Sequence, residues 1–379
     1  MTTPNRPGPE VAWFSALCDD DYEYLGVPDP DLRSSWTHCR DIVTTAERNG
    51  FDNVLLPSGY ALGIDGVPFA GGIAAITEQI KLLLAVRCGE MWPPQLARQL
   101  AGLDEMLDGR LTINIISSDL PGTQLASEPR YARTLEVMAI LRMLLAGNPV
   151  EHRGDFYELD LDAPRIASAR ATARREAGLP ETPPFYFGGL SEPAREVAAA
   201  GADVYLMWPD TTPEISAIVS DMRARADRHG RRLRFGYRTH VVVRETETDA
   251  RAAAARLLSK LDAAEGEAIR NRSLDTTSAG VSRQAELRDT SDDDGFVEDH
   301  LWTGIARARS GCGAAIVGDP DQVVAKLRGY MELGIDAFIL SGYPHIAECD
   351  LVAEHVLPAL RRPERPDEPS SGPDVTTRH

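Results

Sequence analysis

Short, continuously apolar segments recur along this chain and are separated by longer stretches of mixed polarity. A continuous apolar run is typical of a strand that is covered on both faces, whereas a half-exposed strand alternates apolar and polar residues. The segments that we predict to be strands are 11–17, 53–57, 81–87, 111–116, 185–189, 203–208, 234–243 and 337–340. Each is short enough for a strand and too short for a typical helix.

Stretches with helical periodicity follow most of these strands. The predicted helices are 33–50, 93–107, 131–146, 213–230, 249–261, 322–333 and 351–360, and another begins at Ser191. Strand and helix therefore alternate eight times, while a doubly wound sheet usually has about six strands. With right-handed crossovers, this pattern predicts an α/β fold of the (β/α)₈ TIM-barrel class.

Two long segments interrupt the alternation. Residues 148–183 carry a predicted hairpin near 150–157 followed by an Arg- and Ala-rich connector, and residues 262–312 are polar. Structureless loops of such length are uncommon unless they are functional or disordered, so we predict that the second is a mobile lid before the last crossover helix. We predict one domain over 1–360 and a disordered, Pro- and Glu-rich tail over 361–379.

Composition narrows the class of protein. Hydrophobic residues make up 43% and charged residues 26% of the 379 positions, which is typical of a soluble globular protein. We find no apolar run of transmembrane length and no secretory signal. The five cysteines are odd in number and lack CxxC spacing, which favours reduced thiols in the cytoplasm over disulfides or a zinc site.

The formal charge of −18 argues against nucleic acid and anionic membranes as partners. An anionic substrate would therefore need arginines of its own at the binding site. Acidic runs such as 19–21 and 292–294 are interpreted as solvated loops, because metal cages need alternating ligands.

Polar, aromatic and cationic residues collect where the predicted strands end. In a parallel barrel these ends meet at one rim, which carries the chemistry. Arg238 and His240 are two positions apart on one strand and therefore share a face. A buried arginine is costly unless it meets an anion. The rim positions are Cys18, Asp19, 58–60, 87–90, 117–119, 188–191, Trp208, 238–240 and 343–345.

Common cofactor and catalytic motifs are absent from the sequence. Gly188 to Ser191 joins a strand to a helix start and suits a phosphate, although an ordinary loop has the same pattern. There is no GxGxxG, no GxxxxGK[ST] and no GxSxG, which argues against a Rossmann dinucleotide site and a serine hydrolase. His345 and Glu348 lack further ligands, so we predict no metal site.

Several segments in the same order resemble the bacterial luciferase-like flavin monooxygenases, and within them the alkanesulfonate monooxygenases. The resemblance covers about residues 11–360. Its sharpest parts are Tyr-Phe-Gly-Gly at 186–189, Arg-Phe-Gly-Tyr-Arg-Thr-His-Val at 234–241, Leu-Trp-Thr-Gly at 301–304, Val-Gly-Asp at 317–319 and Leu-Ser-Gly-Tyr-Pro-His at 340–345.

The resemblance implies a two-component enzyme that takes reduced FMN from a separate NAD(P)H-dependent flavin reductase. With dioxygen it would cleave the C–S bond of an organosulfonate, giving an aldehyde and sulfite. The family also implies a homodimer or homotetramer. The catalytic residues implied are Arg238, His240, Arg309 and Tyr343. The substrate-binding residues implied are Trp208, His345 and Tyr60, and the FMN-binding residues are Asn114, Tyr131, Gly189, Leu190 and Ser191.

Two departures from the family pattern affect the expected substrate. The loop at 58–65 lacks the cysteine that the family usually carries, and Cys18 and the acidic residues 19–21 replace a histidine after the first strand. We expect a shifted or narrower substrate range, and residues 19–21 suit a polyhydroxylated or amine-bearing molecule. Hydroxylation, N-oxidation or Baeyer–Villiger chemistry on another molecule stays open, as does a non-catalytic flavin-binding role.

Overall fold

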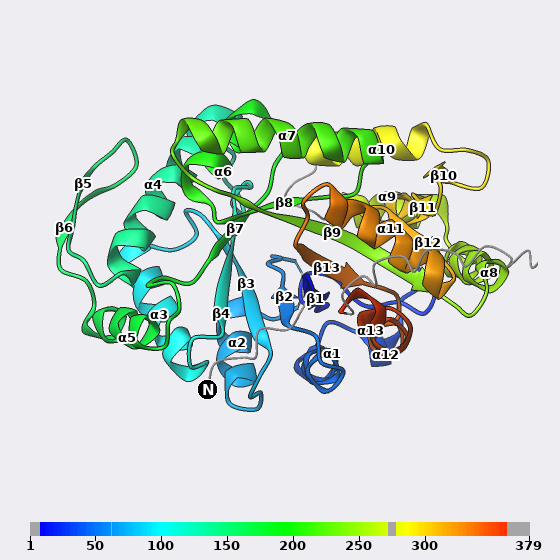
Figure 1. The fold of residues 1–379 in the computed structure, drawn as a ribbon, viewed down its shortest axis with the longest axis horizontal. Helices are drawn as coiled ribbons and strands as arrows, with labels where there is room; N and C mark the ends of the chain where they lie inside the picture. The colour runs from blue at the N-terminus through cyan, green and yellow to red at the C-terminus, as the bar shows by residue number, and fades with distance from the viewer. Residues whose placement is uncertain (1–7, 62, 272–277, 362–379) are drawn as a thin grey trace, which may run out of the picture.

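Eight parallel strands form a closed barrel in the computed structural model, which describes residues 8–61, 63–271 and 278–361 (Figure 1). Around the ring, the strands are β1 (Glu10–Phe14), β2 (Asn53–Leu56), β3 (Lys81–Arg87), β4 (Leu111–Ile116), β7 (Phe185–Phe187), β8 (Val204–Met207), β9 (Arg234–Val243) and β13 (Ala337–Ser341). Pairing of β9 with both β8 and β13 closes the ring. The predicted (β/α)₈ barrel is confirmed, because every predicted strand overlaps one of these eight.

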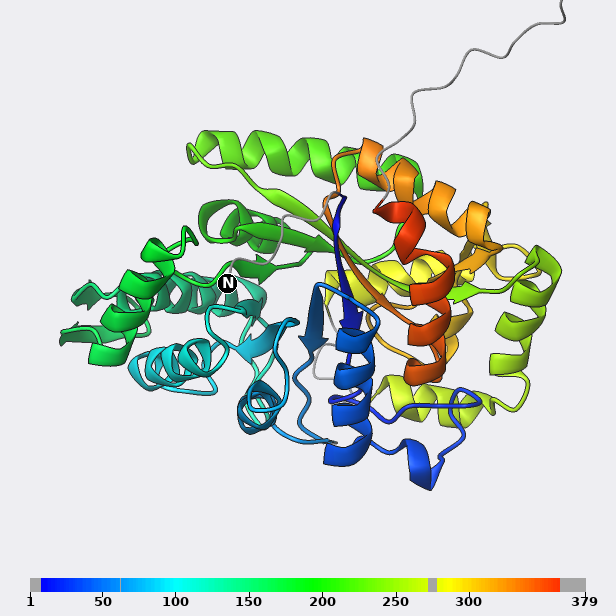
Figure 2. The same cartoon turned by 60° about the horizontal axis from the view of Figure 1, so that its bottom comes forward.

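Helices cover the outside of the barrel (Figures 1 and 2). They are α1 (Trp36–Arg48), α2 (Gly66–Ala74), α3 (Pro93–Met106), α4 (Ser127–Leu145), α6 (Glu192–Gly201), α7 (Thr212–Arg228), α8 (Glu247–Leu258), α11 (Pro320–Glu332), α12 (His345–His355) and α13 (Leu357–Leu360). In Figure 2, α1 and α12 lie side by side, so the helix after the first strand contacts the helix after the last strand. The last predicted helix starts earlier than expected, at His345, directly after the turn that follows β13.

Burial explains why the strands lack polar alternation. All residues of β2 and β13 are buried, because one face contacts the helices and the other contacts the barrel interior. The interior is filled by a small apolar cluster consisting of Ala12, Phe14, Leu55, Leu83, Tyr186, Val204 and Ile339. A barrel that is filled in this way is a packed core and not a pore, so ligands must bind at its rim.

The first insertion contains the predicted hairpin, with β5 (Val150–Arg153) antiparallel to β6 (Glu158–Leu161). The predicted connector after it is wrong in part, because residues Arg165–Glu176 form helix α5. This helix lacks a broad apolar face and is held instead by buried charges. Arg174 donates to Asp104 of α3 at 2.7 Å, and Arg170 donates to the same carboxylate at 3.3 Å.

The second insertion is more ordered than the predicted loop. It contains α9 (Ala263–Arg270), α10 (Ala279–Asp289), β10 (Phe296–Glu298), β11 (Leu301–Trp302) and a 3₁₀ turn, η2 (Gly304–Arg307). A further strand, β12 (Ala315–Gly318), extends the sheet beyond the barrel by pairing with the end of the long β9. Residues 272–277 lie outside the described residues, and the motion expected of a lid stays a prediction.

No helix in the described ranges is long and apolar enough to cross a lipid bilayer. The predicted tail falls almost wholly on residues 362–379, outside the described residues.

Candidate active site

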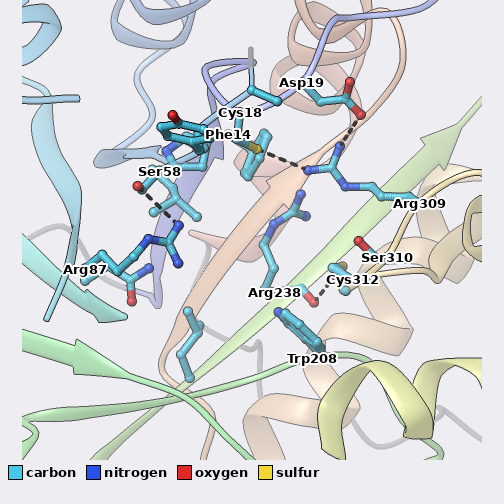
Figure 3. Close-up of a pocket in the computed structure, with 18 of the residues that line it drawn as sticks. Phe14, Cys18, Asp19, Ser58, Arg87, Trp208, Arg238, Arg309, Ser310 and Cys312 are labelled. Carbon is cyan, nitrogen blue, oxygen red and sulfur yellow. Dashed lines mark hydrogen bonds and ion pairs between the residues drawn. The ribbon is translucent and has the colours of Figure 1, made fainter. Parts of the chain in front are cut away.

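A cavity of about 230 Å³ opens at the carboxyl ends of the barrel strands (Figure 3). Its walls come from the loops after β1 and β2, from β3, β4 and β9, from the segment after β8, and from residues 309–312 of the second insertion. The charged side chains that line it are Asp19, Arg87, Arg238 and Arg309. The cavity is therefore cationic within an acidic protein, as the rim pattern predicted.

Arg238 brings a nearly unpaired charge into this cavity. Its side chain extends from β9, is 3% exposed, and lies over the ring of Phe14 at 4.4 Å. Nη1 donates to the carbonyl of Thr239 at 2.7 Å, while the buried Nη2 has no hydrogen-bond partner among the described residues. Burial lowers the pKa of Arg238, and the charge of Arg309 lowers it further. An anion in the cavity would give Nη2 an acceptor and would compensate the buried charge of Arg238.

Arg309 joins the second insertion to the end of β13. Its Nη1 donates to the hydroxyl of Tyr343 at 2.7 Å, and the same nitrogen lies 3.9 Å from the carboxylate of Asp19. Burial raises the pKa of Tyr343, although the charge of Arg309 opposes the rise. The phenol is therefore neutral near pH 7. Because its oxygen accepts from Arg309, its own proton is available to a second acceptor.

His240 is hydrogen-bonded through both ring nitrogens and does not line the cavity. Nε2 lies 3.2 Å from the carbonyl of Cys312, and Nδ1 lies 2.7 Å from the hydroxyl of Ser341. A carbonyl only accepts, so Nε2 carries the proton and Nδ1 accepts from Ser341. Burial and the nearby charge of Arg238 hold the pKa of His240 well below its ordinary value. The ring also stacks on Tyr343 at 5.3 Å, so this geometry positions the tyrosine and the 309–312 segment.

His345 lies behind Tyr343 and is held by a buried carboxylate. Asp21 accepts from Nδ1 of His345 at 2.7 Å, from its backbone N–H at 2.9 Å, and from Nε2 of His38 at 2.9 Å. Burial raises the pKa of Asp21, but the two histidines outweigh this effect and the pKa lies below its ordinary range. The carboxylate therefore clamps the loop after β1 to the start of α12.

Trp208 forms the wall of the cavity below Arg238 (Figure 3). Two glycines allow the second insertion to approach this ring closely. A Cβ at Gly280 would lie 2.9 Å from the indole, and one at Gly311 would lie 3.2 Å from it. Gly311 also has φ +88°, a conformation that side chains disfavour. The indole thus fixes how α10 and the 309–312 segment cover the cavity.

The residues expected to bind flavin lie at two places. Asn114 of β4 lines the cavity, whereas Ser191 is the N-cap of α6. The hydroxyl of Ser191 is buried, caps no backbone N–H, and has no partner among the described residues. The acidic first-turn residue Glu192 is paired with Arg225 at 2.6 Å. Tyr131 lies beside this turn, with its hydroxyl 3.5 Å from the Cβ position of Gly189, the residue before Leu190.

The structure brings most predicted residues together. Those that line the cavity are Tyr60, Asn114, Trp208, Arg238 and Arg309. Tyr343 contacts the cavity through Arg309, and His240 and His345 lie behind it. Tyr60 is 74% exposed and lies at the mouth. Among the described residues, no group of three or more His, Cys, Asp or Glu is arranged to hold a metal ion.

The lining residues that carried no predicted catalytic, substrate-binding or flavin-binding role include Arg87, Ser310 and Cys312. Arg87 ends a predicted strand, so its place at the rim could be predicted from the sequence. Its orientation into the cavity could not be predicted, because neighbouring residues on a strand point to opposite faces. The exact end of β3 decides which face Arg87 is on.

A family model described as luciferase-like monooxygenase matches residues 18–337. The chain belongs to this family. It is 60% identical over 358 residues to a sulfoquinovose monooxygenase of Novosphingobium aromaticivorans, covering 93% of this chain and 96% of the relative. It is 49% identical over 361 residues to a sulfoquinovose monooxygenase of Agrobacterium fabrum, covering 95% and 92%.

Solved structures of low sequence identity share the fold. A long-chain alkane monooxygenase superposes with a TM-score of 0.71 at 17% identity, covering 95% of this chain and 92% of that chain. The oxygenating constituent of 3,6-diketocamphane monooxygenase, solved with FMN, has a TM-score of 0.64 at 14% identity, covering 93% and 98%. These similarities support the barrel assignment.

Proposed function

We propose that this protein is a flavin-dependent monooxygenase that uses reduced FMN and dioxygen to cleave the C–S bond of sulfoquinovose, a hexose carrying a sulfonate on C6. The observation that carries the proposal is the buried guanidinium of Arg238, which has an unpartnered Nη2 and faces the cavity beside Arg309. The sulfoquinovose monooxygenases that are 60% and 49% identical to the chain support the choice of substrate.

A sulfonate satisfies the requirements of this end of the cavity. Its three oxygens accept several hydrogen bonds and its charge compensates a buried cation. Arg238 offers Nη2. Arg309 offers the N–H groups that its hydrogen bond to Tyr343 does not use. The overall charge of −18 would otherwise repel such an anion, so these local arginines provide the attraction.

The chain also offers groups that fit FMN. Ser191 has a buried hydroxyl without a partner at the start of a ten-residue helix, where backbone N–H groups favour a phosphate. Asn114 offers a side-chain amide from β4 inside the cavity. When bound, reduced FMN would supply the electrons that activate dioxygen. We propose that a separate NAD(P)H-dependent reductase delivers it.

The overall reaction balances as sulfonate, dioxygen and reduced FMN giving aldehyde, sulfite, oxidised FMN and water. One oxygen atom enters C6 and the other leaves as water, while the C–S electron pair departs with sulfite. In our proposal Arg238 and Arg309 hold the sulfonate oxygens and stabilise the departing charge. Tyr343 holds a proton at its phenol oxygen, which the hydrogen bond from Arg309 orients.

Water must be excluded while the oxygenation proceeds. Trp208 and residues 309–312 cover the cavity, and His240 ties the carbonyl of Cys312 to the barrel. We propose that His240 and His345 position this cover and Tyr343 and do not themselves contact the substrate. If the second insertion closed over the substrate as a lid, the closure would also bring Arg309 to the sulfonate.

Sulfite release tests the proposal. Purified protein is incubated with FMN, NADH, a flavin reductase and sulfoquinovose, and sulfite is measured against controls lacking protein or reductase. We expect sulfite and a C6 aldehyde in equal amounts. A parallel panel contains alkyl, aromatic and other sugar sulfonates. No sulfite from any sulfonate would contradict the proposal, and an oxygenated product that retains the sulfonate would indicate hydroxylation instead.

A further inference from the structure

The cavity has a second polar wall, opposite the side where Arg238 and Arg309 meet (Figure 3). It consists of Arg87 at the end of β3 and Ser58 in the loop after β2, and we call this pair the Arg87 wall. Arg87 is 5% exposed, so its guanidinium is buried almost as completely as that of Arg238. The mechanism above gives this wall no role.

Hydrogen bonds use only part of the donor capacity of Arg87. Nε donates to Glu90 at 2.8 Å, and Nη2 reaches the hydroxyl of Ser58 only at 3.5 Å. The buried Nη1 has no hydrogen-bond partner among the described residues. Leaving such a buried donor unpaired is unfavourable, and an acceptor from a ligand would remove this penalty.

The charge on Arg87 indicates what kind of acceptor suits this wall. Glu90 forms an ion pair with it at 2.8 Å, so the pair is close to neutral. Arg238, by contrast, forms no ion pair with any described residue, and Arg309 has only Asp19 at 3.9 Å. A sulfonate is therefore drawn to Arg238 and Arg309, whereas the Arg87 wall offers neutral oxygens two kinds of partner. Its N–H groups donate, and the Ser58 hydroxyl both donates and accepts.

We propose that Arg87 and Ser58 form a hydroxyl-binding subsite that selects a polyhydroxylated sulfonate over an alkyl sulfonate. The inference rests on the proposed function, because it assigns the two ends of one substrate to the two walls. The sulfonate binds Arg238 and Arg309, and ring hydroxyl oxygens accept from Nη1 and Nη2 of Arg87. An unpaired buried donor discriminates strongly, because a substrate that lacks the matching oxygen leaves it unsatisfied.

Two ligands of six carbons separate the contributions of the walls. Sulfoquinovose and hexane-1-sulfonate share the sulfonate but only the first has hydroxyl groups. The KM for sulfoquinovose is measured by sulfite release, and hexane-1-sulfonate is measured as a competitive inhibitor. Arg87→Gln should raise the KM for sulfoquinovose about 10- to 100-fold, as expected for a lost charged donor. The inhibition constant of hexane-1-sulfonate should change less than about threefold.

Three controls make the outcomes distinguishable. Ser58→Ala removes only a hydroxyl and should raise the KM for sulfoquinovose about 3- to 10-fold; it decides the question if Arg87→Gln fails to fold. Arg175→Gln removes an exposed ion-pair arginine of α5, 2.8 Å from Glu181, and should leave both constants unchanged. The affinity of each variant for FMN is followed by flavin fluorescence and should also be unchanged.

Other results would overturn the inference. Equal weakening of both sulfonates would place Arg87 in general anion binding, and a comparable loss of FMN affinity would make it a flavin contact. An unchanged KM in Ser58→Ala together with an unfolded or unaffected Arg87→Gln would also reject the subsite. If the unmodified protein releases no sulfite from sulfoquinovose, the proposed function fails first, and this result is distinct from all of these.

Discussion

Replacing Arg238 by methionine should weaken sulfonate binding about 10- to 150-fold without destabilising the fold. Arg238→Met keeps a long side chain that can contact the ring of Phe14, over which the guanidinium now lies at 4.4 Å. It removes the charge and every N–H group. Most buried arginines are paired, and removing one leaves a buried partner charge behind. Arg238 has no ion-pair partner among the described residues, so no carboxylate is left behind.

The size of the effect follows from the contacts of this side chain. Losing the 2.7 Å bond to Thr239 costs about 1 kcal/mol, and losing the cation–π contact costs about 0.5–2 kcal/mol. Removing the unpartnered Nη2 gains about 1–3 kcal/mol. These contributions nearly cancel, so the melting temperature should shift by less than about 3 °C. Sulfonate binding should weaken by about 1.5–3 kcal/mol, which is roughly 10- to 150-fold.

Thermal unfolding with and without sulfoquinovose measures both quantities. A ligand that binds only the folded protein raises the melting temperature, so the unmodified protein should be stabilised by the sulfonate and the variant should not. Sulfite release at saturating reduced FMN gives the KM in parallel. A variant that melts far lower, or that the sulfonate still stabilises fully, would refute the assignment of Arg238 as the sulfonate-binding group.

Further predictions concern the neighbouring groups. Arg309→Ala should lower kcat/KM for sulfite release about 10²- to 10³-fold with little change in melting temperature, and an equal loss of stability would mark a structural role. Tyr343→Phe should lower kcat about 10²- to 10⁴-fold with little change in KM. Because burial raises the pKa of Tyr343, its proton stays bound above the ordinary range of about 10, and the unmodified enzyme should show no loss of rate from phenol ionisation at pH 9–10. A rate that falls there in the unmodified enzyme but not in the residual activity of Tyr343→Phe would contradict this. Burial raises the pKa of both Cys18 and Cys88, but Cys18 is only half-buried and lines the cavity, whereas Cys88 is buried. N-ethylmaleimide should therefore modify Cys18 first and sulfonate should slow the reaction, as read by peptide mass spectrometry.

The barrel was predictable because its strands are buried on both faces. Every residue of β2 and β13 is buried, and this burial leaves the continuous apolar runs that identify them. Helices α5 and α2 were missed for different reasons. Arg165–Glu176 folds as α5 through ion pairs with Asp104, which lies 66 and 70 positions before the two arginines that contact it. Gly66–Ala74 folds as α2 although it contains several glycines, and Gly72 allows Trp36 to pack against it.

The site was predictable as a set of strand ends but not as a set of orientations. Arg238 and His240 share a face of β9, yet only Arg238 lines the cavity, because the ring of His240 is held between Ser341 and Cys312. Cys312 lies 72 residues from His240 in the sequence, and no local sequence pattern predicts such a contact. Arg87, in contrast, lines the cavity although it had no predicted role. Only the closed barrel places its unpartnered Nη1 on the wall opposite Arg238.

A single-turnover experiment without any reductase tests the central claim most directly. FMN is reduced chemically under anaerobic conditions, mixed with the protein and sulfoquinovose, and then exposed to dioxygen. The account predicts sulfite together with an equal amount of C6 aldehyde, up to one of each per reduced flavin, and neither product with oxidised FMN. Re-oxidation of the flavin without any sulfite would contradict it.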